Sequence, residues 1–399
     1  IQESRTSSPL GTRPSQATRR GARSLRPGAG WPTVAPASSI RGRLIFGYQE
    51  NLRNVLAEKS LDGILITNLT NIRYISGFTG SAASCLVTPE GQYFITDGRY
   101  IEQSKNQVNG FERFIDMSSH FSQIKENNLN PNGFKLAFEG DHMSFAQYKT
   151  MVKTFPNTKW ENSSMILEDL AAVKDQSEID CLRTAVEVTD KVYEEILPML
   201  RPGTTEKQVA NKMVSKYREY AEGEAYSPIV ATGPNGALPH AIPTDREFQN
   251  GDFIVIDAAA KYGGYHADMT RTPVVGEASE KHQEVYDIVK EAQQRGCDTA
   301  KAGVACNVVD AATRDYIREM GYSEYYTHGT GHGLGLEIHT SPRFNPQSEA
   351  VLEVNNVMTI EPGIYIAGWG GVRIEDDVII NEDGCEILNK TTKDLVVLN

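Results

Sequence analysis

The stretch 254–271 carries two acidic residues, Asp257 and Asp268, on what its pattern predicts to be a β-hairpin. The first arm consists of apolar, β-prone residues, Gly263-Gly264 can form the turn, and the second arm is polar and contains threonine. A turn at the two glycines makes the aspartates diagonal neighbours, and a turn one residue earlier makes them direct partners. Both registers place the two side chains on one face. Carboxylates roughly 5–7 Å apart on one face repel unless positive charge lies between them, so a divalent metal is the natural partner.

A second acidic pair, Glu361 and Glu375, repeats this arrangement in the stretch 358–377. The pattern is again strand, glycine turn and strand, and a turn centred on Gly368 makes the two glutamates face each other. If the two hairpins pack about a pseudo-twofold axis, four carboxylates converge. Four such charges cannot share a buried site unless metal ions bind there or some of the groups are protonated.

Between the hairpins, His332 lies in the glycine-rich run 328–339. The run lacks the glutamate of an HExxH zinc motif, and its glycines do not fit the GxGxxG dinucleotide loop. Glycines at alternate positions let backbone approach closely, which is typical of a strand beside a metal pocket. One histidine and four carboxylates form a hard, oxygen-rich ligand set. This set favours two Mn²⁺ ions about 3.5–4 Å apart, with Co²⁺, Fe²⁺ or Zn²⁺ as substitutes.

Each of these features has an ordinary structural explanation when it is taken alone. A single aspartate pair on a hairpin is usually surface charge, and a single histidine such as His332 is usually a hydrogen-bonded core residue. The run Glu375-Asp376-Asp377 would usually be a solvated acidic turn. The metal hypothesis rests on the joint pattern, because all five ligand candidates fall on matching elements of a repeated unit.

The repeated unit is predicted from helical periodicity and capping signals. Residues 175–178 and 205–208 predict capping boxes before two helices, and the second helix ends near Tyr220. A loop leads from there to the first hairpin. Helices over 279–300 and 308–320, the glycine-rich run and the second hairpin repeat this order. The sequence therefore predicts an internal duplication.

Residues 44–165 are expected to form a small α/β domain without a catalytic constellation, followed by a catalytic domain over 166–399. The preceding segment 1–43 has eight arginines, no lysine, five prolines and a net charge of +7. This composition predicts a disordered leader. A cloning-derived extension and an organelle transit peptide explain it equally well, so the segment carries no weight in the fold prediction.

The composition of the whole chain argues against several classes of function. A formal charge of -12 disfavours nucleic acid as the main partner. Five scattered cysteines without a CxxC pair suit a reducing compartment better than a disulfide scaffold. No run approaches the roughly 18 apolar residues of a membrane span. We therefore expect a cytoplasmic protein, with an organelle as the alternative if residues 1–43 are native.

Several motifs together resemble those of the proline-specific metallopeptidases of the pita-bread fold, the group of Xaa-Pro aminopeptidase and Xaa-Pro dipeptidase (prolidase). The motifs are Asp268-Met-Thr-Arg271, His328-Gly-Thr-Gly-His332, Glu361-Pro-Gly363, Gly371-Val-Arg-Ile-Glu-Asp376 and, nearer the N-terminus, Thr70-Asn-Ile-Arg-Tyr-Ile-Ser-Gly-Phe78. The resemblance covers about residues 45–399. It implies an α/β N-terminal domain of the creatinase type and an α+β pita-bread catalytic domain with an internal pseudo-twofold duplication.

The resemblance also implies a role for each site residue. One metal ion would be bound by Asp257 and the other by His332 and Glu361, with Asp268 and Glu375 bridging the two. Glu361 would double as general base. The remaining residues would contact the substrate: His240 and His339, which would also stabilise the tetrahedral intermediate, and the further pocket residues His328 and Arg373.

The function implied by these motifs is a dinuclear-metal hydrolase that releases the N-terminal residue from Xaa-Pro peptides, an Xaa-Pro aminopeptidase. Xaa-Pro dipeptidase is the alternative, because both enzymes share the motifs. A metal-free binding protein of the same fold is a more remote alternative. The expected partners are proline-containing peptides and a second copy of the chain in a homodimer, with no nucleic acid and no membrane.

Overall fold

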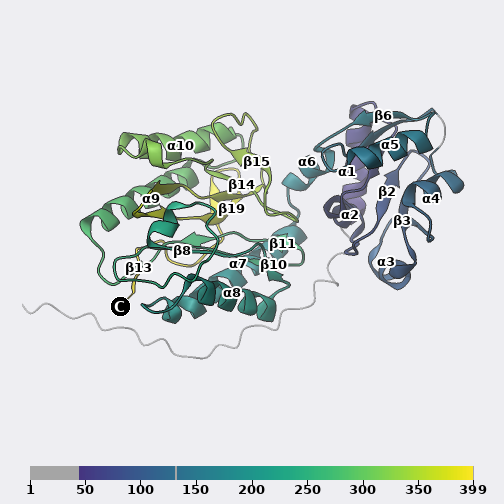
Figure 1. Cartoon of the computed structure of the whole chain (residues 1–399). Helices are drawn as coiled ribbons and strands as arrows, with labels where there is room; N and C mark the ends of the chain where they lie inside the picture. Colours follow the sequence, from purple (N-terminus) through teal and green to yellow (C-terminus); the bar gives the residue numbers. More distant parts are fainter. Residues whose placement is uncertain (1–44, 131–132, 399) are drawn as a thin grey trace, which may run out of the picture. The chain divides into compact units, whose positions relative to one another are not determined.

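A computed structural model describes residues 45–130 and 133–398 (Figure 1). The leader predicted for residues 1–43 lies outside the described residues. Within the described ranges, no helix is long and apolar enough to cross a membrane. An α/β part comes first in the chain, and an α+β part that begins with α7 follows.

The α/β part is built on a mixed six-stranded sheet with the strand order β4-β3-β2-β1-β5-β6. The central strand β1 pairs antiparallel with β2 and parallel with β5. The elements are α1 (Ile45–Glu58), β1 (Gly63–Ile66), α2 (Leu69–Ser76), β2 (Ser84–Val87), β3 (Gln92–Thr96), α3 (Ile101–Gln107), β4 (Glu112–Ile115), α4 (His120–Glu126), β5 (Lys135–Phe138), α5 (Phe145–Thr154), β6 (Lys159–Asn162) and α6 (Ile166–Ala172).

The α/β architecture predicted for this part of the chain is confirmed. Every residue of β1 is buried, which is the expected environment of a short, continuous apolar strand. The helices α2, α4 and α6 and the edge strands β4 and β6 were not predicted. Both edge strands are largely exposed, so they lack a hydrophobic alternation. Local caps delimit α2: the Asn68 side chain accepts the Thr70 N–H, and Gly77 ends the helix at a φ of 81°.

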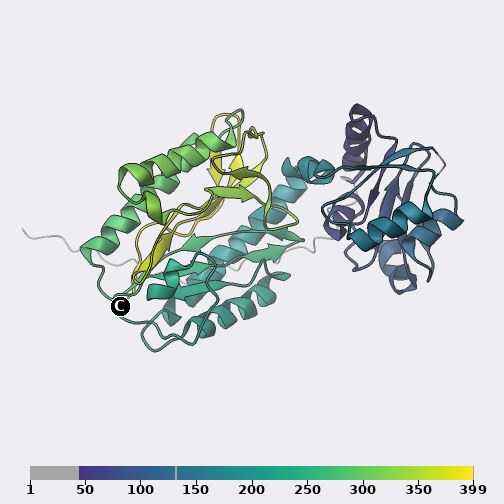
Figure 2. The same ribbon diagram turned by 45° about the horizontal axis from the view of Figure 1, so that its top comes forward.

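The α+β part contains two helix pairs with strands between them (Figure 2). The helices are α7 (Gln176–Ile196), α8 (Glu206–Tyr220), α9 (Glu280–Thr299) and α10 (Cys306–Glu319). The strands of the first half are β7 (Gly223–Glu224), β8 (Ile229–Thr232), β9 (Ile254–Asp257), β10 (Ala260–Tyr262), β11 (Tyr265–His266), β12 (Thr270–Arg271) and β13 (Val274–Val275). Those of the second half are β14 (Gly331–Gly333), β15 (Thr340–Phe344), β16 (Val357–Ile360), β17 (Gly363–Ile366), β18 (Gly370–Arg373), β19 (Asp376–Ile380), β20 (Cys385–Ile387) and β21 (Val397–Leu398).

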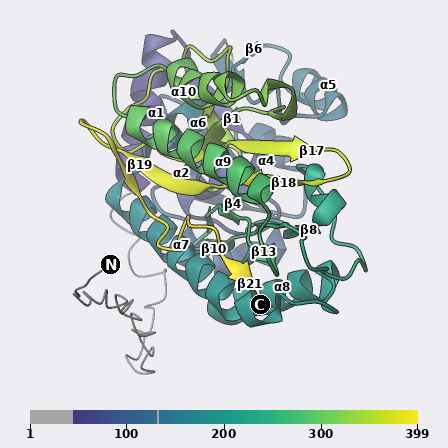
Figure 3. The ribbon, with the colours of Figure 1, turned by 90° about the vertical axis from the view of Figure 1, so that its left-hand side faces the viewer.

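The predicted duplication is confirmed by the order of these elements. In the first half α7 and α8 precede β8 and the hairpin β9–β12, and in the second half α9 and α10 precede β14 and the hairpin β16–β19. Both predicted capping boxes are present, at Asp175 with Glu178 and at Thr205 with Gln208. In each half the first helix of the pair contacts the strands of the hairpin, α7 along β10 and β11 and α9 along β17 and β18 (Figure 3).

The first hairpin turns at Gly263 and Gly264, whose φ angles of 60° and 88° fit a two-residue turn of type I′. Lys261 pairs with His266, and the same register continues to the pairing of Asp257 with Thr270. Asp257 and Asp268 are therefore diagonal neighbours, as predicted for a turn at the two glycines. The strands are interrupted between these pairings, because β9 and β10 belong to different sheets.

The second hairpin also keeps one register across an interruption. Ile366 pairs with Gly370 around a turn at Gly368, and Ile360 pairs with Asp376 beyond the gap. Continued through the gap, this register places Glu361 opposite Glu375, as predicted. Pro362 lies in the gap, and proline cannot donate a ladder hydrogen bond, which accounts for the break.

The segment between α8 and the first hairpin is not the plain loop that the sequence predicts. It contains β7, the buried strand β8 and a 3₁₀ helix over Gly233–Ala237. β8 pairs antiparallel with β9 along its whole length. The strand is only four residues long, too short to distinguish a strand from a buried loop by periodicity. This strand matters for function, because the residues before it form one wall of the site.

Candidate metal centre

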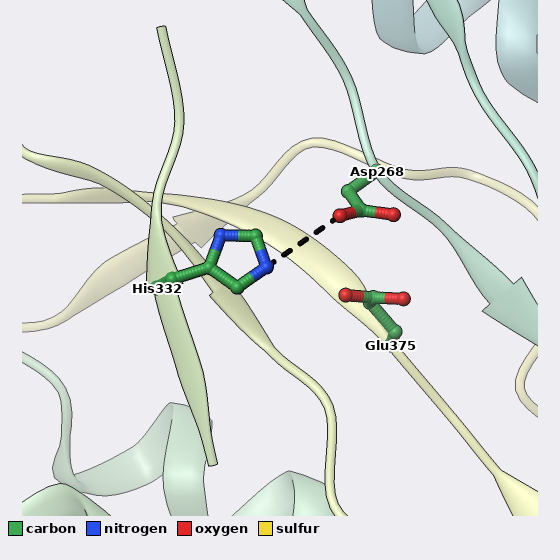
Figure 4. A group of neighbouring side chains, drawn as sticks. All are labelled: Asp268, His332 and Glu375. Atoms are coloured by element: carbon green, nitrogen blue, oxygen red, sulfur yellow. Dashed lines mark ion pairs between the residues drawn. The ribbon is translucent and has the colours of Figure 1, made fainter. Parts of the chain in front are cut away.

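Three predicted ligands meet at one point between the two halves. One side-chain ligand atom each from Asp268, His332 and Glu375 lies within 4.8 Å of the other two, and all three residues are buried (Figure 4). The His332 Nε2 atom is 3.7 Å from the Asp268 Oδ2 atom and 3.4 Å from the Glu361 Oε1 atom. The first hairpin, the strand β14 and the second hairpin therefore deliver one imidazole and three carboxylates to a common space.

Backbone hydrogen bonds between the hairpins fix the two bridging candidates. The Asp268 N–H donates to the Asp377 Oδ2 atom at 3.0 Å, and the Glu375 N–H donates to the Thr270 carbonyl oxygen at 3.2 Å. The Thr270 hydroxyl also donates to the Glu375 Oε2 atom at 2.7 Å. Each hairpin thus orients the carboxylate that the other one carries.

His332 is held as a neutral ligand by its neighbours. Its Nδ1 atom is 3.2 Å from the Gly333 carbonyl oxygen, so Nδ1 carries the proton and Nε2 presents a lone pair to the carboxylates. Burial, followed by the charge of His339, lowers the pKa of His332 to about 3. A neutral imidazole with Nε2 free is the form that binds a metal ion.

Asp257, the fifth predicted ligand, is linked to Asp268 by a residue that sequence reasoning missed. The Tyr226 hydroxyl contacts the Oδ1 atoms of both aspartates, and the Asp257 Oδ2 atom pairs with the Arg373 guanidinium. Tyr226 precedes β8 in the segment predicted as a loop, and an isolated tyrosine there gives no signal of its own. Only the return of β8 alongside β9 brings it to the aspartates.

Among the described residues, Arg373 is the cation that contacts these carboxylates, and each of its three side-chain nitrogen atoms has a hydrogen-bond acceptor. Its Nε atom donates to the Thr270 hydroxyl at 2.9 Å, and its Nη1 atom donates to the Tyr365 hydroxyl at 2.7 Å. Burial raises the pKa of Asp268, Glu361 and Glu375, and neighbouring carboxylates raise it further. One guanidinium cannot neutralise four carboxylates, so the centre has an excess of buried negative charge.

Divalent cations can neutralise this excess of buried negative charge. Four carboxylates and one neutral imidazole give a mostly oxygen donor set, which suits hard or borderline divalent ions. Asp268 and Glu375 each turn a carboxylate oxygen toward the same point as His332. The residues present therefore fit a divalent metal site.

The centre opens into a cavity of about 540 Å³. All nine residues predicted for the site line it: Asp257, Asp268, His332, Glu361, Glu375, His240, His339, His328 and Arg373. Ile242, Ile338 and Phe344 add apolar surface. The cavity thus combines a polar floor with apolar walls, as expected of a pocket for a small organic substrate.

The three histidines outside the ligand set lie in different surroundings. His240 and His339 are exposed to the cavity, and the His339 ring packs edge-on against His332 with the ring centroids 4.4 Å apart. His328 is partly buried, and its Nε2 atom is 2.9 Å from the Tyr365 hydroxyl. Burial, followed by the charge of Arg373, lowers the pKa of His328 to about 4, so it stays neutral at physiological pH.

A second missed residue, Arg343, places a positive charge on the cavity wall. It lies on β15, lines the cavity with His339, and its charge lowers the pKa of that histidine after the larger effect of burial. Arg343 follows His332 by eleven residues and lies outside the glycine-rich run 328–339. No spacing rule would have singled it out.

Comparison with known proteins agrees with this geometry. Residues 180–382 match the family description "Metallopeptidase family M24", and residues 49–173 match "Creatinase/Prolidase N-terminal domain". An Xaa-Pro dipeptidase of Pyrococcus furiosus is 35% identical over 353 residues, which are 87% of this chain and 99% of that protein.

Solved structures with the same architecture give a similar result. An Xaa-Pro dipeptidase from Bacillus anthracis has a TM-score of 0.86 and 40% identity, covering 89% of this chain and all of that one. An X-Pro aminopeptidase from Thermotoga maritima has a TM-score of 0.78 and 37% identity, covering 85% of this chain and 98% of that one. The chain is therefore a pita-bread metallopeptidase that belongs to family M24 and carries a creatinase/prolidase N-terminal domain.

Proposed function

We propose that this chain is a dinuclear-metal Xaa-Pro dipeptidase. The observation that supports the hydrolytic part is the buried convergence of Asp268, His332 and Glu375, beside Asp257 and Glu361, at the floor of the cavity. In this proposal Asp257 would hold one ion, His332 and Glu361 would hold the other, and Asp268 and Glu375 would be shared between them. Mn²⁺ is the preferred ion, with Co²⁺, Fe²⁺ and Zn²⁺ as substitutes.

Bound divalent ions would supply Lewis-acid polarisation of the scissile carbonyl and a lowered pKa for the attacking water. The side chains of the protein supply proton transfer and stabilisation of the oxyanion. Glu361 accepts the proton of the attacking water and returns it to the proline nitrogen, which must leave as a protonated amine. His339 and His240 face the cavity, where imidazole donors can hydrogen-bond the oxyanion that develops on the carbonyl oxygen.

Arg343 supports a dipeptide rather than a longer substrate. In an Xaa-Pro dipeptide the proline carries a free carboxylate, and a guanidinium on the wall beside His339 is the group that best pairs with it. In a tripeptide this carboxylate is replaced by a neutral amide. The ranking from sequence, which placed aminopeptidase first, is therefore reversed, in agreement with the dipeptidase names of relatives 35% and 40% identical.

The decisive experiment compares one Xaa-Pro dipeptide with the matching Xaa-Pro-Yaa tripeptide after Mn²⁺ loading. We expect a clear preference for the dipeptide in kcat/KM, and we expect Arg343→Ala to lose most of that preference by raising KM for the dipeptide. Arg318→Ala is the matched control, because Arg318 is an exposed α10 residue paired with Asp315. A preference for the tripeptide would refute the dipeptidase assignment, and full activity of metal-stripped protein would refute the metal mechanism.

An Xaa-Pro aminopeptidase remains the second candidate, because the Thermotoga maritima relative with that title is 37% identical. The same substrate pair decides between the two. In the aminopeptidase case the tripeptide is preferred, and Arg343→Ala leaves its cleavage unchanged.

A further inference from the structure

Two cysteines outside the candidate metal centre contact each other. Cys297 is buried near the C-terminal end of α9, and Cys385 is partly exposed at the start of β20. The two side chains adjoin, because the Cys385 Sγ atom donates to the Cys297 carbonyl oxygen at 3.3 Å. We propose that Cys297 and Cys385 form a reversible disulfide, a redox modification site that is coupled to the metal centre.

The two thiols differ in the way that thiol–disulfide exchange requires. The adjacent Cys297 side chain, assisted by the charge of Lys393, lowers the pKa of Cys385. The adjacent Cys385 side chain, followed by burial, raises the pKa of Cys297. Cys385 has more thiolate character and is more accessible than Cys297, so Cys385 is the attacking sulfur. The buried Cys297 is placed to attack the mixed disulfide that Cys385 then forms.

The reaction uses a low-molecular-weight disulfide as oxidant, for which oxidised glutathione is the probe. The Cys385 thiolate attacks one sulfur of the small disulfide and expels the other as a thiolate. Cys297 then loses its proton to solvent and attacks the Cys385 sulfur, which expels the second small thiolate. Two protein thiols are thus oxidised to one disulfide, and one small disulfide is reduced to two thiols.

A hydrogen-bonded path connects Cys297 to a metal-ligand candidate. The Gln293 Nε2 atom donates to the Cys297 Sγ atom at 3.3 Å and to the Asp376 Oδ2 atom at 3.0 Å. Asp376 is fully buried and directly follows Glu375. Lys393 joins the same network, because its Nζ atom donates to the Gln293 Oε1 atom at 2.8 Å.

Disulfide formation must disturb this path. A disulfide brings its sulfur atoms to about 2.05 Å, well inside the contact distance of two sulfur atoms that are not bonded. The Cys297 sulfur then moves toward β20 and away from the Gln293 amide, which also orients Asp376. Loss of a partner outside the ligand shell commonly weakens metal binding by about 10- to 100-fold, and we expect about tenfold here because Glu375 itself keeps its contacts.

The modification is tested on the folded full-length chain by titration with a glutathione redox buffer, acid quenching, alkylation and mass mapping. We expect a Cys297–Cys385 link in the wild type that dithiothreitol reverses. Cys297→Ser should stop at a glutathione adduct on Cys385, and Cys385→Ser should form neither species. Cys181→Ser, which removes a cysteine of α7, is the matched control and should behave as the wild type. A wild-type protein that forms no such link under oxidising buffer would overturn the proposal.

The coupling is tested by calorimetric titration of Mn²⁺ into metal-stripped protein before oxidation, after oxidation and after reduction again. We expect affinity to fall about tenfold on oxidation and to recover on reduction. Gln293→Leu should weaken binding in the reduced protein and remove the response to oxidation. An affinity that is the same in the oxidised and reduced protein would overturn the coupling.

Discussion

Replacing Thr270 with valine tests how the two hairpins hold the metal ligands together. The Thr270 side chain is completely buried. Its hydroxyl donates to the Glu375 Oε2 atom at 2.7 Å and accepts from the Arg373 Nε atom at 2.9 Å. Valine has nearly the same shape, so Thr270→Val removes both hydrogen bonds without opening a cavity.

The size of the effect follows from the charge of both partners. A hydrogen bond to a charged group contributes about 1.5–3 kcal/mol, compared with about 1 kcal/mol for a neutral one. Arg373 keeps its contacts with Asp257 and Tyr365, so we expect a loss of about 3 kcal/mol in the free energy of unfolding, the lower end of the sum for two bonds. Glu375 loses the group that orients its Oε2 atom. Mn²⁺ affinity should therefore fall by about 10- to 100-fold, as for other partners outside the ligand shell.

Thr189→Val is the matched control for this variant. Thr189 is also completely buried, and its hydroxyl donates to the Ala185 carbonyl oxygen at 2.8 Å and accepts from the Ala260 N–H at 2.9 Å. Both partners are neutral backbone groups that do not belong to the metal centre. Denaturant unfolding should show a smaller loss, about 2 kcal/mol, and calorimetry should show wild-type Mn²⁺ affinity. If Thr270→Val binds Mn²⁺ as tightly as Thr189→Val does, the argument that Thr270 orients Glu375 is wrong.

Three further predictions concern other parts of the chain. His339→Ala should lower kcat on Xaa-Pro dipeptides by roughly 10²- to 10³-fold while elemental analysis still finds the full metal content; loss of metal would identify His339 as a ligand instead. Burial lowers the pKa of Lys174 from its ordinary value of 10.5 to about 8, so the unfolded chain binds this proton more tightly. The contribution of Lys174 to the free energy of unfolding should consequently rise by up to about 3 kcal/mol between pH 8 and pH 10.5, so the stability difference between the wild type and Lys174→Met, which should be the more stable at pH 7, should change by that amount over this range; a difference that does not change with pH would contradict the assignment. Light scattering should find a homodimer that survives deletion of residues 1–43 with its activity intact, and a full-length monomer would contradict this expectation.

The hairpin registers could be predicted because short-range rules determine them. Two glycines in succession specify a tight turn at residues 263–264, and the strand period of two then fixes which residues share a face. The same reasoning placed Glu361 opposite Glu375 around Gly368. The helix starts at Asp175 and Thr205 follow in the same way from local capping chemistry.

The contacts that orient the ligands could not be predicted, because they depend on tertiary packing. Tyr226 reaches both aspartates only because β8 returns alongside β9, and Arg343 reaches the cavity only because β15 pairs with β14. Neither residue stands in a motif. The roles of the five ligand candidates likewise remain proposals that metal binding must test, even though the chain brings all five to one cavity.

The interruptions in the two hairpins explain how strands can build such a centre. In a continuous ladder the backbone N–H and C=O groups that point toward the partner strand would be paired within each hairpin. At the breaks these groups can bond to the other hairpin instead. The Asp268 N–H donates to the Asp377 side chain, and the Glu375 N–H donates to the Thr270 carbonyl oxygen. The register nevertheless continues through each gap, which keeps the carboxylate positions defined. The ligand candidates Asp268, Glu361 and Glu375 occupy the breaks and Asp257 borders one, because only there can the two hairpins approach closely enough to share one site.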